Sequence, residues 1–221
     1  MSARGFSLKS TAVLLGLMLM AGLPAQARPL FHTSSEASTQ GMAVPSARVV
    51  ETIMAAPNAV EIERLDACVA DHRLKPRDYR QLLREVVFDS APGHRLHVVR
   101  GRNDPGSRCD EFYGAHLFVY YLIDETVRGG VASFKVVFQN GGDSLSIYPE
   151  RRFGLNDIEA TGCIVDECSI ARMGFDGRSY RPVRCSLLKR VREREVVVPR
   201  RCGSDGFQDY QSSGFVQRRK P

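Results

Sequence analysis

Hydrophobic residues in the N-terminal half of the chain recur at helical spacing. The apolar residues that follow Ala47 fall on one face of a short helix, and Val60–Ala70 repeats the pattern. The stripe is longest in Arg77–Phe88, where Pro76 precedes the first turn, a position at which its missing N–H costs nothing. The spacing therefore predicts two or three helices before residue 90.

After Pro92 and Gly93 the period changes from helical to strand-like. Asn140–Asp143 and Asp176–Gly177 are strong hairpin signals between strand-like segments. The predicted strands are His94–Arg100, Ala115–Ile123, Val131–Gln139, Ser144–Tyr148, Asp157–Ile164, Cys168–Phe175, Arg178–Leu188 and Glu195–Pro199.

Helices first and strands afterwards are typical of an α+β fold, with two or three N-terminal helices followed by an antiparallel β-sheet meander. The length fits a single α+β domain over residues 47–210. Residues 28–46 are rich in small and polar residues and read as a flexible lead. Residues 211–221 read as a basic disordered tail.

Residues 1–27 have the layout of a cleavable signal peptide. Arg4 and Lys9 precede an apolar run of about a dozen residues, and the segment ends in the small-residue pattern Ala25-Gln26-Ala27. The run is too short to span a bilayer, and no later stretch is apolar and long enough to do so. We therefore expect a periplasmic or secreted protein without a transmembrane span after signal removal.

Positive charge is concentrated at the C-terminal end. Loss of Arg4 and Lys9 with the signal lowers the net charge from +6 to +4, yet residues 178–221 alone hold twelve Lys or Arg against four acids. An acidic envelope protein or an anionic polymer is the matching partner. Export argues against nucleic acid. The alternative is a solvated strand edge on which charge deters edge-to-edge pairing.

The six cysteines point to a disulfide-braced domain, because their number is even and the predicted compartment is oxidising. There is no C-x-x-C spacing, so we predict neither a metal site nor a cofactor. Sequence alone allows 15 pairings of six cysteines. The pairing we favour is Cys68–Cys109, Cys163–Cys168 and Cys185–Cys202.

Candidate catalytic motifs are weak. His94 and His97 resemble a metal-binding H-x-x-H, but in a strand residues three apart point to opposite faces. Ser186 and Lys189 match S-x-x-K at a strand end, where the lysine is not one helical turn from the serine. We assign no catalytic residue.

Aromatic and cationic side chains on the predicted hairpins suggest a surface for a glycan or a protein. The alternative is ordinary core and cross-strand pairing. The candidate binding residues are Tyr148, Arg151, Arg152, Arg178, Tyr180 and Arg181.

These observations rank three functions. The first is an exported, non-enzymatic binding or inhibitor-type protein of the bacterial cell envelope. The second is an envelope-polymer hydrolase, of glycan or peptidoglycan, that uses a carboxylate pair drawn from Asp143, Glu150 and Asp157. The third is a structural envelope component that associates through its basic tail. The sequence does not indicate an oligomeric state.

Overall fold

The computed structural model describes residues 27–34, 36–56, 79–101, 118–164, 167–191 and 194–203. These residues form two short helices, α1 (Ala47–Met54) and α3 (Tyr79–Leu82), and ten strands. The strands are β1 (Phe31–Ser34), β2 (Leu83–Ala91), β3 (His94–Gly101), β4 (Phe118–Arg128), β5 (Val131–Gly142), β6 (Ser144–Arg152), β7 (Leu155–Ile164), β8 (Glu167–Phe175), β9 (Tyr180–Val191) and β10 (Arg194–Arg200).

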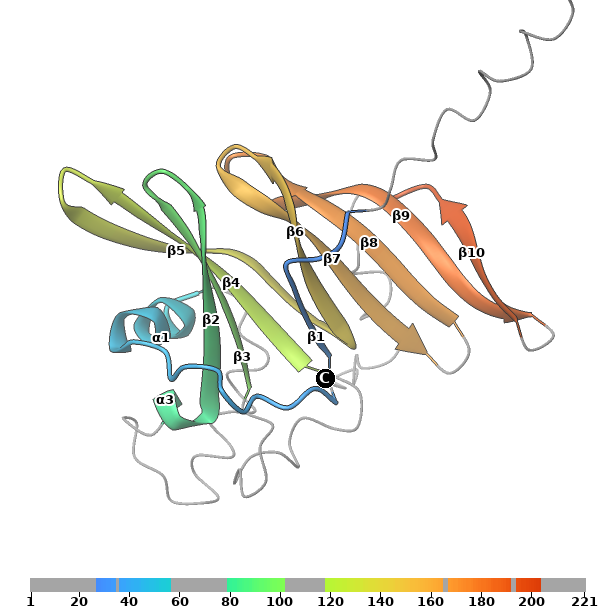
Figure 1. The fold of residues 1–221 in the computed structure, drawn as a ribbon, viewed down its shortest axis with the longest axis horizontal. Helices are drawn as coiled ribbons and strands as arrows, with labels where there is room; N and C mark the ends of the chain where they lie inside the picture. The colour runs from blue at the N-terminus through green and yellow to red at the C-terminus, as the bar shows by residue number, and fades with distance from the viewer. Residues whose placement is uncertain are drawn as a thin grey trace, which may run out of the picture.

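The strands make two antiparallel sheets (Figure 1). One sheet has the order β2-β3-β4-β5, and the other has the order β1-β6-β7-β8-β9-β10. Strand β1 pairs with β6 over Phe31–Ser34, so part of the segment read as a flexible lead belongs to the larger sheet. None of the described helices is long and apolar enough to cross a membrane.

The predicted α+β fold class is wrong, because the described chain is mostly β. The third predicted helix, Arg77–Phe88, shows why: among its described residues Tyr79–Leu82 are helical, and the chain then enters β2. Its apolar residues also suit a strand, and β2 pairs with β3 along its length. Tertiary pairing therefore overrides the local helical pattern. The predicted helix Val60–Ala70 lies outside the described residues.

The first predicted helix is confirmed as α1. The Ser46 side chain caps it by accepting a hydrogen bond from the Val49 backbone N–H at 3.2 Å. Val49, Val50 and Ile53 are buried, and the helix packs against β5. The helix thus covers part of one face of the smaller sheet.

The predicted hairpin at Asn140–Asp143 is wrong, because β5 and β6 belong to different sheets. The segment instead carries the chain across to β7: the Asp143 N–H donates to the Thr161 carbonyl at 2.7 Å. A Cβ at Gly142 would lie 2.7 Å from that same oxygen, so the approach requires glycine. Glycine here serves a close backbone contact between sheets rather than a tight turn.

The hydrophobic core lies between the two sheets. Leu96, Val98 and Leu122 of the smaller sheet are fully buried against Ile147 and Ile158 of the larger sheet. Burial of each such side chain contributes roughly 1.5–3 kcal/mol to folding. The same core does not reach β10, whose seven residues are all exposed.

Candidate functional site

Tyr180 lies in the core rather than on a binding surface. Its ring is 5 % exposed and contacts Phe175 and Phe138. Its hydroxyl donates to the Asn156 carbonyl at 2.7 Å. Burial raises the pKa of Tyr180. This ring cannot serve as a platform for a ligand.

Tyr148 belongs to a closed network on the outer face of the larger sheet. The Arg172 guanidinium covers its ring at 3.4 Å from the centroid, and its hydroxyl donates to Glu159 at 3.3 Å. Partial burial, and then the Glu159 carboxylate, raise the pKa of Tyr148. Arg172 also donates to Glu150 at 2.7 Å. No pattern in the sequence singles out Arg172, because its contacts arise only when β6, β7 and β8 lie side by side.

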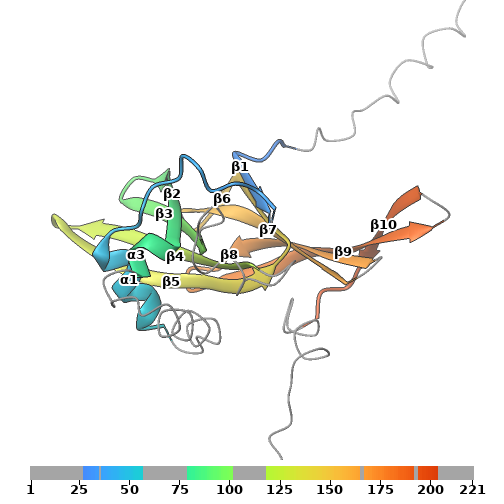
Figure 2. The ribbon, with the colours of Figure 1, turned by 90° about the horizontal axis from the view of Figure 1, so that it is seen from below.

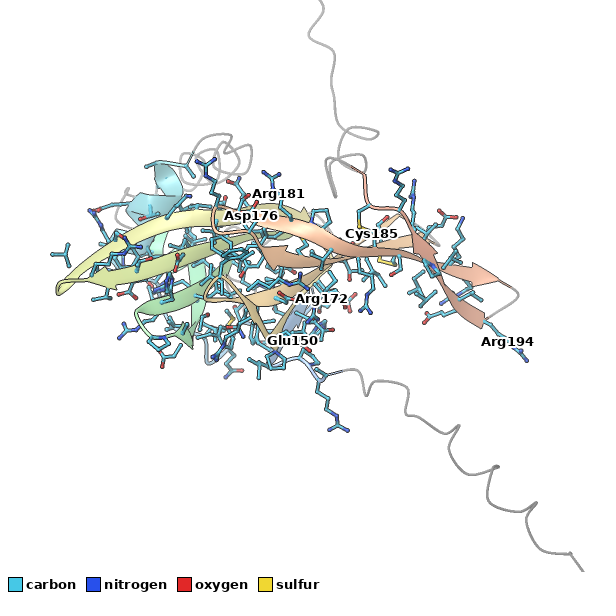
Figure 3. The ribbon with its side chains drawn as sticks, turned by 90° about the horizontal axis from the view of Figure 1, so that it is seen from above. Glu150, Arg172, Asp176, Arg181, Cys185 and Arg194 are labelled. Carbon is cyan, nitrogen blue, oxygen red and sulfur yellow. A yellow bond between two sulfur atoms is a disulfide. The ribbon has the colours of Figure 1, made fainter. Side chains whose placement is uncertain are left out.

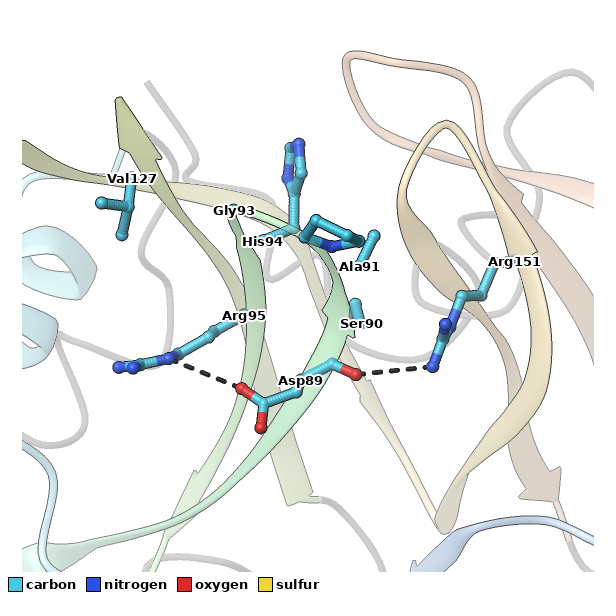
Figure 4. A pocket seen from close by; sticks show the side chains of 9 residues that line it. Asp89, Ser90, Ala91, Gly93, His94, Arg95, Val127 and Arg151 are labelled. Atoms are coloured by element: carbon cyan, nitrogen blue, oxygen red, sulfur yellow. Dashed lines mark hydrogen bonds and ion pairs between the residues drawn. The ribbon is translucent and has the colours of Figure 1, made fainter. Parts of the chain in front are cut away.

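The two neighbouring arginines occupy different environments. Arg152 extends over Gly174, where a Cβ would lie 2.5 Å from its Cδ, and donates to buried Asp157 at 3.2 Å. Arg151 borders a hollow of about 640 Å³ beside the β2–β3 turn, where it donates to the Asp89 carbonyl (Figure 4). Both side chains are exposed, but only Arg152 is paired with a carboxylate of the described residues.

Arg178 and Arg181 lie at the β8–β9 turn, so the hairpin predicted at Asp176–Gly177 is confirmed (Figure 3). Asp176 Oδ1 accepts hydrogen bonds from the backbone N–H groups of Ser179 and Arg178. These bonds, with Arg181 3.3 Å away, lower the pKa of Asp176. The six candidate residues are thus divided between core, network, hollow and turn, and they do not form one binding surface.

The two histidines of β3 point to opposite faces, as the strand pattern predicts. His94 Nδ1 lies 3.0 Å from Asp124 Oδ1 on one face. On the other face His97 Nδ1 lies 3.1 Å from Glu85 Oε2, and its Nε2 lies 3.0 Å from Glu125 Oε2. In the described part of the chain, no group of three or more His, Cys, Asp or Glu residues is arranged to hold a metal ion.

Glu85, His97 and Glu125 form a buried charged row across β2, β3 and β4, and each side chain is at most 10 % exposed. Burial alone would lower the pKa of His97, but hydrogen bonds and attraction from both carboxylates outweigh it and raise the pKa above its usual value. The protonated ring has an N–H on each nitrogen and finds a carboxylate acceptor on both sides, which is why these neighbours favour the protonated form.

The three carboxylates considered for hydrolysis are each engaged internally. Asp143 Oδ2 accepts from the Cys163 N–H at 2.5 Å, and Glu150 pairs with Arg172. Asp157 lies between Arg152 and Arg172. Each of the three carboxylates already has a partner within the chain, so none of them is free to act on a bound substrate. This geometry therefore does not favour the hydrolase.

The β9–β10 hairpin projects away from the rest of the molecule (Figures 2 and 3). Val196, Val197 and Val198 are 42 %, 58 % and 43 % exposed, and no other large apolar residues that are exposed in the described chain are consecutive. Arg194 and Arg200 flank them. In the described residues no carboxylate lies within ion-pair distance of either arginine.

Two disulfides brace the larger sheet, and one of them links the two ends of this hairpin. Cys185–Cys202 joins β9 to the residues that follow β10, and Cys163–Cys168 joins the ends of β7 and β8. These are two of the three predicted pairs, and both are confirmed; the third, Cys68–Cys109, lies outside the described residues. Bonds of this kind persist in oxidising compartments.

Comparisons of the chain with family models, with curated proteins and with solved structures gave no match. The features of the chain that bear on its function are therefore the projecting hairpin and the charged side chains that have no ion-pair partner among the described residues.

Proposed function

We propose that the protein is an exported, non-enzymatic binding protein of the bacterial cell envelope, and that its β9–β10 hairpin binds an acidic partner. One observation carries the proposal: Arg194 and Arg200 border an exposed valine run on a projecting hairpin, and no described carboxylate lies within ion-pair distance of either arginine. An exposed apolar patch with a charged rim is typical of a protein interface.

Charge elsewhere in the molecule supports this reading. Arg152, Arg172 and Lys189 each contact a carboxylate of the same chain. Their charges are therefore already compensated inside the fold, whereas those of Arg194 and Arg200 are available to a partner. Export remains part of the proposal; it rests on the leader pattern of residues 1–27 and agrees with the two disulfides.

Quantitative capture from a bacterial envelope extract tests the function. The chain lacking residues 1–27 is immobilised beside Arg194→Glu/Arg200→Glu and the control Arg178→Glu, which changes an exposed arginine in the β8–β9 turn. We expect the unmodified chain and the control to retain an acidic protein at low salt and release it at high salt. The double variant should retain none.

Equal retention by all three proteins would contradict the role of the hairpin. Retention that survives protease treatment of the extract would identify an anionic polymer instead of an acidic protein. Turnover of peptidoglycan or glycan by the purified chain would contradict the non-enzymatic assignment.

A further inference from the structure

Strand β10 leaves one edge of the larger sheet open. It pairs with β9 on one side, from Arg194 opposite Val191 to Arg200 opposite Cys185. No described strand pairs with its other side. The outward backbone N–H and C=O groups of β10 therefore have no partner in the described part of the chain. Such a row is a ready template for another strand.

The other sheet edges are engaged, short or without an exposed apolar run. The β2 edge is already engaged at Glu85, which exchanges two backbone hydrogen bonds with Ala43. Strand β1 offers only four residues, and β5, although it is also an edge strand, carries no consecutive exposed large apolar residues. Among the described edges, β10 combines a free side with a position that projects from the body (Figure 2).

The side chains of β10 define what an added strand must carry. Because successive residues alternate between faces, Arg194, Val196, Val198 and Arg200 lie on one face. The two arginines are six positions apart, roughly 20 Å in an extended strand. Lys189, directly opposite Val196 on β9, lies on the same face, but its charge is paired with Glu167 at 2.6 Å. The face therefore reads basic, apolar, apolar, basic.

A second copy of the chain is a poor occupant of this edge. Antiparallel pairing of two β10 strands centred on Val197 would place Arg194 of each copy opposite Arg200 of the other. Like charges directly opposite each other destabilise a strand pair. A different strand that carried carboxylates opposite Arg194 and Arg200 would be attracted at the same two positions.

We propose that the free edge of β10 binds an extended segment of a protein partner as an additional antiparallel strand, and that this segment carries two apolar residues flanked by carboxylates six positions apart. This inference rests on the proposed function and specifies its partner. Backbone hydrogen bonds supply affinity, and the flanking charges supply selectivity. The Cys185–Cys202 bond holds the end of β10 in register with β9 before binding, which reduces the ordering cost.

Three synthetic peptides test the inference on the disulfide-bonded chain lacking residues 1–27. The acidic peptide is Thr-Glu-Thr-Val-Thr-Val-Thr-Glu-Thr. The second replaces both Glu by Lys. The third is the acidic peptide with both valine amides N-methylated, so that its charge stays and its central backbone donors are lost. Fluorescence titration measures affinity, and amide hydrogen exchange reports protection in β10.

We expect the acidic peptide to bind at least about ten times more tightly than either control, a difference of about 1.4 kcal/mol. It should also slow amide exchange in β10. Arg194→Glu/Arg200→Glu should reverse the preference, so that the Lys peptide binds better. Arg178→Glu should behave as the unmodified chain.

Equal affinity for the acidic and N-methylated peptides, without protection of β10, would overturn strand addition and leave the proposed function standing as electrostatic binding of an acidic partner. Absence of peptide binding, together with hairpin-dependent capture from envelope extract, would overturn only this partner description. Absence of both would overturn the inference and the proposed function together.

Discussion

Two regions of the molecule are rich in charge: the buried row of Glu85, His97 and Glu125, and the projecting β9–β10 hairpin. They differ in whether the charged side chains are buried and paired. In the row each ring nitrogen of His97 has a carboxylate within hydrogen-bond distance, and all three side chains are buried. On the hairpin, Arg194 and Arg200 are exposed, with no carboxylate of the described residues in ion-pair range. Compensated, buried charge serves the fold, whereas exposed and uncompensated charge is free to serve a partner.

The strongest test of this contrast removes one charge from the buried row. Glu125 Oε2 lies 3.0 Å from His97 Nε2 and 3.4 Å from the Arg95 guanidinium. Glu125→Gln removes the negative charge from both contacts. Breaking a buried charged pair on one side costs about 3–5 kcal/mol. We expect urea unfolding to show a loss in this range.

Glu195→Gln is the matched control on the hairpin, because its carboxylate is 64 % exposed and 4.0 Å from Arg190. Its effect should stay within about 0.5 kcal/mol. Equal losses in the two variants would remove the distinction between the regions.

Loss of the Cys185–Cys202 bond should have the next largest effect. Cys185→Ser/Cys202→Ser opens a link across a sequence separation of 17, for which a loss of about 3 kcal/mol is expected. Amide exchange should accelerate in β10 more than in β3 or β4, because only β10 depends on this link. Cys163→Ser/Cys168→Ser spans a separation of 5 and should cost about 2 kcal/mol. A larger loss in the second variant would contradict this assignment.

The pH dependence of stability should trace to the row and not to the hairpin. The folded pKa of His97 is raised above its usual value of 6.5. The stabilisation from this group is therefore fully present below pH 6.5, and it is lost as pH rises through the folded pKa. His97→Gln should flatten this part of the stability curve measured by urea unfolding between pH 6 and 9. An unchanged curve would show that His97 does not gain its proton on folding.

Much of the sheet was predictable, because the strand-like period of His94–Arg100 and the valine run of Glu195–Pro199 both mark segments that pair as strands. Prediction from the sequence failed in segments whose residue pattern is compatible with two different local structures. The stripe in Arg77–Phe88 satisfies a helix locally and a strand once β3 is present. Likewise, the residue types of Asn140–Asp143 are typical of a hairpin turn. In the structure this segment instead connects the two sheets, where it contacts the Thr161 carbonyl.

The candidate site was less predictable for a related reason. Composition located the basic C-terminal region, but burial decides which aromatic residues are accessible. Tyr180 becomes core because it packs on Phe175 and Phe138, and Tyr148 is covered by Arg172. Such contacts between distant strands leave no local signal in the sequence. The pairing of Cys185 with Cys202 was easier, since both flank one predicted strand pair.

The central claim is that Arg194 and Arg200 contribute to binding and not to folding. Urea unfolding tests both parts of this claim, binding and folding, in one experiment. It compares the unmodified chain with Arg194→Glu/Arg200→Glu, each with and without the acidic peptide. Without peptide we expect free energies of unfolding within about 0.5 kcal/mol of each other. With peptide at ten times its dissociation constant, the unmodified chain should gain about 1.4 kcal/mol and the variant nothing. A variant that is already destabilised without peptide, or one that gains as much from it, would contradict the claim.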